Sequence, residues 1–344
     1  MRATQSTRGR WVRIAGATAA AVALVILSAA AAPSTQARAF ALEVLARYAP
    51  DGRAIIDRYE SSPWAYRLPD RSISMSQTDF MDFVPGGTPA EIVAALPTAV
   101  HETCHSYSRK LAWKMLSETH QPWHESLALP ISAGVDLLVP ITPTFPSATL
   151  APRIDPDLRD ARYRTYVATD NANQSTQSKG VYGLLDELDA YRWGTQTAVD
   201  LLAWHRREGP HTRESWTKGL QAVEGMYPAR AQMKLFILTW LQEARTHHAR
   251  EWQAFLDNPT AARALFAVDD AYDRTIRRYA QVKADILRET GMRETGDRIE
   301  MGGGFAIGTG AAEYARFTRA LARPDLQALE QMLRARSAGG HPAH

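Results

Sequence analysis

Four long segments with a helical spacing of apolar residues limit this chain to a mainly α-helical fold more than any other feature. Apolar residues that recur every three or four positions form one stripe along a helix, and that stripe must pack against other elements. Two further segments of the same kind lie near the N-terminus. The helical segments are residues 37–50, 52–62, 181–207, 214–227, 229–256 and 262–290.

A further helix is predicted from Thr88 to about Thr119. Thr88 can cap its N-terminus, Pro89 suits the first turn, and Glu91 completes a capping box. Pro97 then either kinks this helix or begins a second one. The alternation of apolar and polar residues over 72–84 favours a strand before it.

Residues 120–180 interrupt the helical pattern. They hold seven prolines and the polar tract TDNANQSTQSKG, with room for one short helix or strand at 131–141. Long irregular segments in compact domains often form lids or binding loops, so we expect one wall of a cleft, or a lid over it, here. The expected organisation is one α-rich domain over 38–336, with at most a small β element and two lobes as an option, and a disordered tail over 337–344.

The first 37 residues have the pattern of a secretory signal peptide. Four arginines and no acidic residue precede an apolar run at 14–32, and the small residue Ala37 offers a cleavage point before Arg38. An uncleaved anchor helix is the alternative, because the run is close to membrane-spanning length. We expect an exported protein, periplasmic or secreted, with no stable membrane insertion once the signal is cleaved.

The charge and cysteine content narrow the partners and the chemistry. The chain carries a net charge of +3, and the four arginines of the signal account for it, so the mature chain lies near −1. Such a chain gives no electrostatic reason to bind nucleic acid. Cys104 is the single cysteine, so no internal disulfide can form. A lone cysteine on a helix face is more typical of a core residue than of a metal ligand.

The sequence HETCH, residues 101–105, matches the HExxH motif. His101 and His105 stand four residues apart, so both imidazoles lie on one face of the predicted helix. Two neutral imidazoles suit Zn²⁺, which accepts an open fourth position in catalytic sites. Glu102 is rotated away from the metal but can reach a metal-bound water, and we expect it to act as general base.

A third protein ligand is predicted downstream. Glu187 falls on the apolar stripe of the 181–207 helix, and a carboxylate there needs a cation or strong donors. Asp186 and Asp189 point elsewhere, and one of them could accept the outer N–H of a zinc histidine. Glu125 is the rival ligand, although Pro122 and Pro130 leave little room for a supporting helix around it.

HETCH with a downstream helical glutamate resembles the gluzincin branch of the zinc metallopeptidases. YGLLDELDAY, residues 182–191, is also similar to a segment of poorly characterised bacterial HExxH proteins. The resemblance implies a helical zincin-like catalytic domain in which two motif histidines and one later glutamate bind zinc. It also implies a tyrosine or histidine at the oxyanion, for which Tyr182 is the first candidate and Tyr191 the second.

Two functions from different classes remain open at this point. The first is an exported zinc peptidase that acts on peptides or proteins, with His101, His105 and Glu187 on the metal and Glu102 and Tyr182 in catalysis. The second is a non-catalytic helical envelope module that binds a partner and holds a structural metal or none. A structural zinc site should be closed by four protein ligands.

Overall fold

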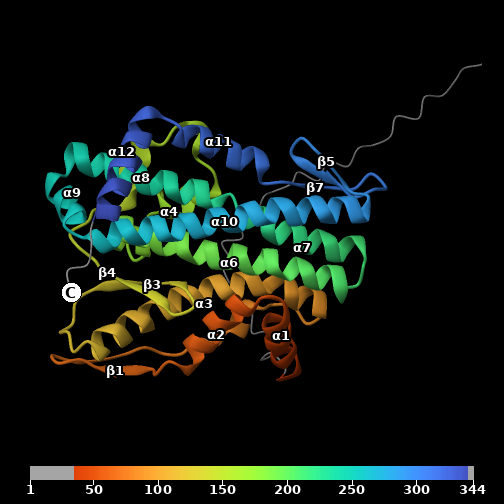
Figure 1. Ribbon diagram of the computed structural model, residues 1–344, viewed down its shortest axis with the longest axis horizontal. Coiled ribbons are helices and arrows are strands. Elements are labelled where there is room, and N and C mark those ends of the chain that lie inside the picture. Colours follow the sequence, from red (N-terminus) through yellow and green to blue (C-terminus); the bar gives the residue numbers. More distant parts are fainter. Residues whose placement is uncertain (1–34, 340–344) are drawn as a thin grey trace, which may run out of the picture.

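The computed structural model describes residues 35–339, and the fold is mainly α-helical as the apolar spacing predicts (Figure 1). Three 3₁₀ helices lie between the others: η1 (Phe80–Phe83), η2 (Ser147–Arg153) and η3 (Pro156–Leu158). The α-helices are α1 (Thr35–Tyr48), α2 (Pro50–Ser61), α3 (Pro89–Glu118), α4 (Ala161–Tyr166), α5 (Ser175–Ser178), α6 (Val181–Arg207), α7 (Arg213–Met226), α8 (Ala229–His247), α9 (Ala249–Leu256), α10 (Pro259–Thr290), α11 (Ala311–Leu321) and α12 (Pro324–Gly339).

Within residues 35–339 the β structure consists of small antiparallel sheets at the edges of the helical body (Figure 1). Two of them are hairpins, β1–β2 and β3–β4, and the third has the order β5–β6–β7. The strands are β1 (Ala65–Arg67), β2 (Ser72–Ser74), β3 (Ser126–Ser132), β4 (Val135–Pro140), β5 (Arg293–Thr295), β6 (Arg298–Glu300) and β7 (Ala306–Gly308).

Helix α6 is the centre of the fold. It packs against α3, α7, α8 and α10, and most of its residues are buried (Figure 1). Leu188, Trp193 and Leu202 on this helix belong to three different hydrophobic clusters, so α6 joins the N-terminal helices, the α8–α10 layer and the β5–β7 end. A helix buried on all sides positions its side chains more rigidly than a surface helix does.

Helix α3 lies directly against α6, and a glycine makes the approach possible. A Cβ atom added at Gly194 would lie 3.1 Å from the Pro97 carbonyl oxygen and 3.3 Å from the His101 Cβ. The predicted capping box is confirmed, since Thr88 and Glu91 bond each other's backbone N–H groups. Pro97 lies inside one helix and does not begin a second one.

Several details of the expected fold are wrong. Residues 72–84 form only the short strand β2 and then η1, because Asp79 caps a 3₁₀ turn through the Met81 N–H. The segment 229–256 is two helices, which separate at His248, whose ring stacks on Phe145 with centroids 4.1 Å apart. The expected tail begins too early, because α12 continues to Gly339.

The segment 120–180, which was expected to be irregular, contains more secondary structure than predicted. Its first part is the β3–β4 hairpin, and its second part holds η2, η3, α4 and α5. Prolines 130 and 140 lie within these strands, at positions where a two-stranded sheet leaves one edge of each strand free. The segment packs over α6 and α8, so it forms a wall of the body and not a detached loop.

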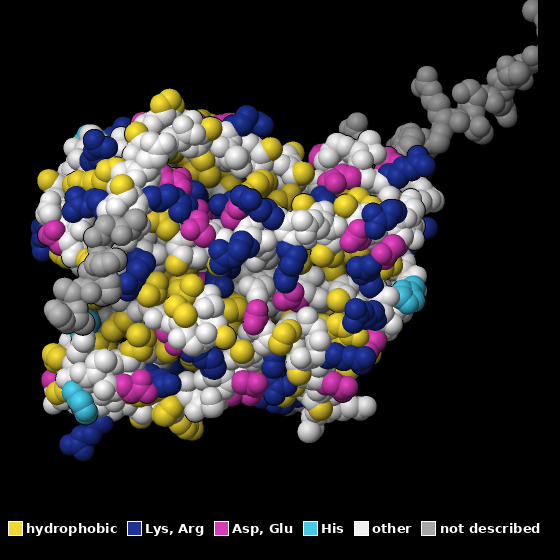
Figure 2. Space-filling model, viewed as in Figure 1, with side chains coloured by type: hydrophobic (Ala, Val, Ile, Leu, Met, Phe, Trp, Pro, Cys, Tyr) yellow, Lys and Arg dark blue, Asp and Glu magenta, His cyan; other side chains and the backbone are white. Residues whose placement is uncertain are grey.

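Most of the predicted signal segment lies outside the described residues. Helix α1 begins at Thr35, so the expected cleavage point after Ala37 falls within its first turn. Within residues 35–339, no helix is both long enough and apolar enough to cross a membrane. On the face drawn in Figure 2, basic and acidic side chains are interspersed with hydrophobic ones.

Candidate metal centre

His101 and His105 meet at the inner face of α3, as the motif spacing predicts. Their Nε2 atoms lie 3.2 Å apart, and their side chains are only 7% and 15% exposed. At this distance one ring can donate an N–H to the other, and the same two nitrogens are also close enough to bind one metal ion together.

Glu187 of α6 completes the cluster. Its Oε2 atom lies 3.8 Å from His101 Nε2 and 3.5 Å from His105 Nε2, and the three ligand atoms fall within 4.8 Å of one another. This oxygen is buried and accepts no hydrogen bond from the residues that the structure describes. A buried carboxylate oxygen without a hydrogen bond, beside two ring nitrogens, fits a metal ion that could bind all three atoms.

Glu125, the rival third ligand, lies elsewhere. Its side chain is 54% exposed and forms an ion pair of 3.3 Å with Lys179. It precedes β3 and is not part of the cluster. Cys104 is also absent from the cluster. It is a buried core residue whose Sγ lies 3.8 Å from Asp189 Oδ2.

The outer nitrogen of His105 has a carboxylate partner. Asp186 Oδ2 lies 2.8 Å from His105 Nδ1, so an N–H donated there directs Nε2 into the cluster. Burial alone would lower the pKa of His105, but the charges of Asp186 and Glu187 outweigh it and hold that pKa well above its usual range. Of the two aspartates predicted for this role, Asp186 is the one in place, while Asp189 pairs with Arg192 at 2.7 Å.

His101 occupies a more apolar position. Its ring meets the Tyr191 ring edge-on with centroids 4.6 Å apart. Burial, reinforced by the charges of His105 and Arg162, holds the pKa of His101 well below its usual range. A neutral imidazole is the form that binds a metal, so this environment prepares His101 as a ligand.

Glu102 borders the cluster without joining it. Its Oε1 lies 4.0 Å from His101 Nε2, and its side chain is 38% exposed, so water can reach it. Burial raises the pKa of Glu102, as do the carboxylates of Glu187 and Asp186, although His105 acts against them. A carboxylate with a raised pKa is a stronger base, which suits a group that takes and returns a proton.

The tyrosine nearest the cluster is not the one expected first. The Tyr182 hydroxyl lies 2.6 Å from Thr142 Oγ1 and is buried there, so it is already engaged. Tyr191 contacts His101, and its hydroxyl lies 3.1 Å from that of Tyr166. The structure therefore favours Tyr191, the second candidate, for a role beside the ligands.

Two residues near the cluster carry no signal in the sequence. Tyr166 ends α4, and burial, Glu187 and Tyr191 raise the pKa of its hydroxyl. Arg162, on the same short helix, places its guanidinium 5.1 Å from the centre of the Tyr191 ring. Neither belongs to a motif, and α4 lies in the segment that was expected to be irregular.

A cavity of about 230 Å³ opens beside the cluster. Its wall includes the cluster residue His105, its partner Asp186, Tyr182 one turn before Asp186 on α6, and Arg109 and Lys179. A cavity that reaches a ligand histidine gives a small molecule access to the candidate metal position.

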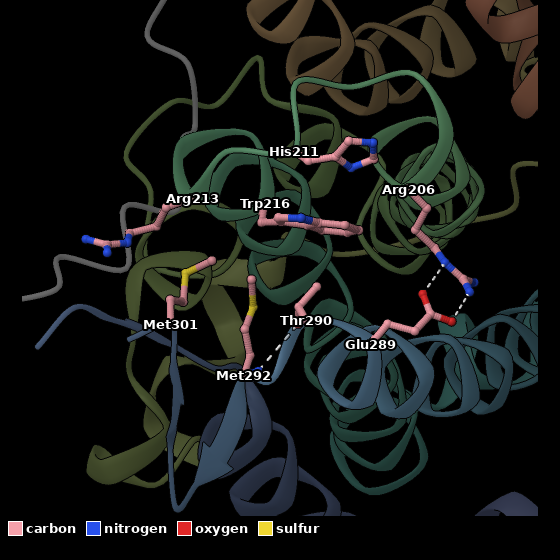
Figure 3. A pocket seen from close by; sticks show the side chains of 8 residues that line it. All are labelled: Arg206, His211, Arg213, Trp216, Glu289, Thr290, Met292 and Met301. Carbon is pink, nitrogen blue, oxygen red and sulfur yellow. Dashed lines mark hydrogen bonds and ion pairs between the residues drawn. The ribbon is translucent and has the colours of Figure 1, made fainter. Parts of the chain in front are cut away.

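A larger cavity of about 490 Å³ lies at the β5–β7 end and contains none of the cluster residues (Figure 3). Arg206 and Glu289 form a two-pronged ion pair across it, and the rest of its lining includes Trp216, Met292 and Met301. Size alone does not define a site, and the converging ligand atoms are elsewhere. The smaller cavity is therefore the one that lies beside the candidate metal position.

The fold and the site define a mainly α-helical protein with a buried His–His–Glu cluster that could hold a metal ion. Comparisons of the chain with protein-family models, with curated proteins and with solved structures found no match in any of the three.

Proposed function

We propose that this protein is an exported zinc-dependent hydrolase, and most specifically a peptidase. The observation that carries the proposal is the convergence of His101, His105 and the unpartnered Glu187 oxygen, with Glu102 at the edge of the same cluster. Three protein ligands leave a fourth position open, which is the pattern of catalytic zinc sites.

Zinc is the metal that the donor set favours. Two imidazole nitrogens and one carboxylate oxygen match the ligands of catalytic Zn²⁺. When bound there, zinc would supply a water of lowered pKa and would polarise the carbonyl group of the substrate. Asp186 supports this choice, because carboxylates commonly hold the outer nitrogen of zinc-binding histidines.

Glu102 is assigned the proton transfers. It takes a proton from the attacking water and then delivers it to the leaving amine, while the carbon–nitrogen bond breaks. The products are a carboxylate-terminated fragment and a protonated amine, so atoms and charge balance. The raised pKa of Glu102 and its partial exposure support both steps.

A tyrosine is assigned to the oxyanion. Tyr191 takes precedence over Tyr182 because its ring contacts His101; both hydroxyls already have a partner, Tyr166 for Tyr191 and Thr142 for Tyr182. Tyr166 and Arg162 lie against Tyr191 and keep its hydroxyl in a polar setting. A donor directed at a developing oxyanion is worth about 3 kcal/mol of transition-state stabilisation.

The alternative of a non-catalytic binding module has less support. A structural zinc site needs four protein ligands. Cys104 could be a fourth ligand by its residue type, but its sulfur lies beside Asp189 and outside the cluster. The exported location is part of the proposal and rests on the N-terminal sequence alone.

Metal analysis and one substitution test the proposal. Purified protein, dialysed and then reloaded, should retain about one zinc per chain by mass spectrometry. Glu102→Gln should keep that zinc but lose activity by about 10²- to 10⁴-fold on a peptide mixture analysed by mass spectrometry. Glu118→Gln, on the same helix with a 62% exposed side chain, is the matched control and should cleave normally.

Two outcomes would end the proposal. A protein that holds no zinc after reloading has no metal site at HETCH. A Glu102→Gln variant that cleaves peptides as fast as the unchanged protein has no general base at this position.

A further inference from the structure

The cavity beside the cluster has a chemical character of its own. Two cations line it, Arg109 from α3 and Lys179 from the turn before α6, together with the polar residues Asn173 and Ser175. The one carboxylate in its lining is Asp186, which is bound to His105. The cavity is therefore suited to receive a negatively charged group.

Neither of these two cations forms a strong ion pair elsewhere in residues 35–339. Arg109 is exposed, and it forms no ion pair within residues 35–339. Lys179 pairs with Glu125 at 3.3 Å, but the Glu125 side chain is 54% exposed. Exposed ion pairs of this kind contribute little and exchange readily with another anion.

The cavity is also small. Its volume of about 230 Å³ lies below the range of roughly 300–1,000 Å³ that holds drug-sized ligands. It has space for about one residue of a peptide together with its terminal group, and not for a long extended chain.

The neighbouring strand β3 offers little backbone for a long substrate. The Ala128 carbonyl accepts a hydrogen bond from Ser108 Oγ at 2.5 Å. The Pro130 carbonyl accepts from Arg192 and from the Trp193 indole, and a proline has no N–H to donate. An extended peptide therefore cannot add to β3 at these positions as it would to a free strand edge.

From these features we infer that the cavity receives the carboxyl-terminal residue of a peptide, with Arg109 and Lys179 binding its α-carboxylate. This inference rests on the proposed function and narrows it to removal of the last residue. Water adds its hydroxyl to the carbonyl carbon of the last peptide bond, the carbon–nitrogen bond breaks, and the amine takes the proton. The products are a shortened peptide and one free amino acid.

A binding experiment separates this inference from the peptidase proposal. The probes are N-acetyl-alanyl-alanine with a free carboxylate and the same compound as its carboxyl-terminal amide. Their dissociation constants are measured by calorimetry on the Glu102→Gln protein, with zinc and after chelation. The free acid should bind about tenfold more tightly or better, because a charge-assisted contact is lost in the amide.

Single substitutions then assign the preference to its residues. Arg109→Gln and Lys179→Gln should each reduce the preference for the acid by about tenfold. Arg277→Gln is the matched control, since it removes the same charge from a 79% exposed side chain paired with Asp273. That variant should keep the full preference.

The outcomes are distinct. Equal binding of acid and amide, no binding of either, or a preference that survives both substitutions would overturn the inference. Cleavage at internal bonds without any preference would leave the peptidase standing and remove the inference. A clear preference in a protein that never cleaves would leave the carboxylate-binding cavity standing and remove the peptidase, and with it the removal of the last residue.

Discussion

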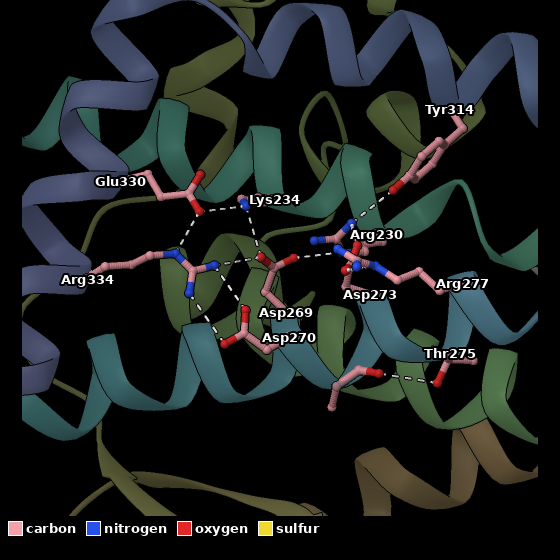
Figure 4. Close-up of polar contacts among 11 residues, drawn as sticks. Arg230, Lys234, Asp269, Asp270, Asp273, Thr275, Arg277, Tyr314, Glu330 and Arg334 are labelled. Carbon is pink, nitrogen blue, oxygen red and sulfur yellow. Dashed lines mark hydrogen bonds and ion pairs between the residues drawn. The ribbon is translucent and has the colours of Figure 1, made fainter.

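Two buried carboxylates in this protein have opposite surroundings. Asp269 on α10 is fully buried, and both of its oxygens are paired: Arg230 lies at 2.8 Å, Lys234 at 2.9 Å and Arg334 at 3.3 Å (Figure 4). Glu187 on α6 is nearly as buried, but its Oε2 has no hydrogen-bond partner among the described residues.

The difference separates a carboxylate with three cationic partners from one that could hold a metal ion. Burial would raise the pKa of Asp269, yet Arg230 and Lys234 outweigh it and lower that pKa below its usual value. The cations come from α8 and α12, so their ion pairs with Asp269 hold α12 and α8 against α10. Around the Glu187 Oε2 atom lie two imidazole nitrogens, at 3.8 Å and 3.5 Å, and the charge of Glu187 helps to raise the pKa of His105.

The largest expected effect comes from removing the charge of Asp269, the carboxylate that has three cationic partners. Asp269→Asn should lower the free energy of unfolding by about 3–4 kcal/mol, because it leaves buried cations without their central partner. The value lies at the lower end of the usual range, since Lys234 keeps Glu330 at 2.8 Å. Urea unfolding followed by circular dichroism measures it.

Asp270→Asn is the control for that substitution. Asp270 contacts the same Arg334 at 3.1 Å, but its side chain is 52% exposed, so the loss should stay below about 1 kcal/mol. Equal losses for the two variants would show that burial and pairing at Asp269 have no special weight.

A third buried titratable group isolates the effect of burial without a charged partner. His205, near the end of α6, lies 2.9 Å from Ser215 Oγ, and burial lowers its pKa to about 4. The unfolded chain binds the proton near pH 6.5, before the folded protein does. The free energy of unfolding should therefore fall as the pH drops from 6.5 to 4, by about 3 kcal/mol, and level off below.

His205→Asn tests this dependence, because asparagine can keep the Ser215 contact and does not titrate. Chelated protein is unfolded in urea at a series of pH values, and the slope between pH 6.5 and 4 should become shallower in the variant. His211→Asn, at an exposed histidine, serves as the control and should leave the slope as it is. An unchanged slope in His205→Asn would assign the pH dependence to other groups.

Much of the fold and the centre of the site could be predicted from local patterns. The apolar stripe of 181–207 matches α6 at both ends, and the capping box at Thr88 places the start of α3. The HExxH spacing predicts that both imidazoles lie on one face, because this follows from helical geometry alone. Glu187 could be found because a carboxylate on a buried stripe conflicts with its neighbours, and such conflicts mark functional sites.

The remaining features depend on contacts between distant segments. Tyr182 and Tyr191 lie on the same helix, and only packing shows that Thr142, forty residues earlier, engages the first hydroxyl. Arg162 and Tyr166 come from a six-residue helix capped by Asp160, too short to give a periodic signal. Local propensity cannot report which partner a side chain meets across the fold.

Glu187→Gln tests the ligand side of the comparison. Zinc at 100 times its dissociation constant should stabilise the unchanged protein by about 2.7 kcal/mol. A variant that binds zinc about 100-fold more weakly should gain less than about 0.5 kcal/mol at the same concentration. Without zinc the variant should lose little, because His105 still has Asp186 at 2.8 Å and no cation is left unpaired. Thermal unfolding with and without zinc measures both quantities, and Glu125→Gln should behave like the unchanged protein because its carboxylate is exposed.

A Glu187→Gln protein that was destabilised equally with and without zinc would place Glu187 in the same class as Asp269, as a structural partner of His105. A loss of stability seen only with zinc would show that Glu187 binds the metal through this oxygen.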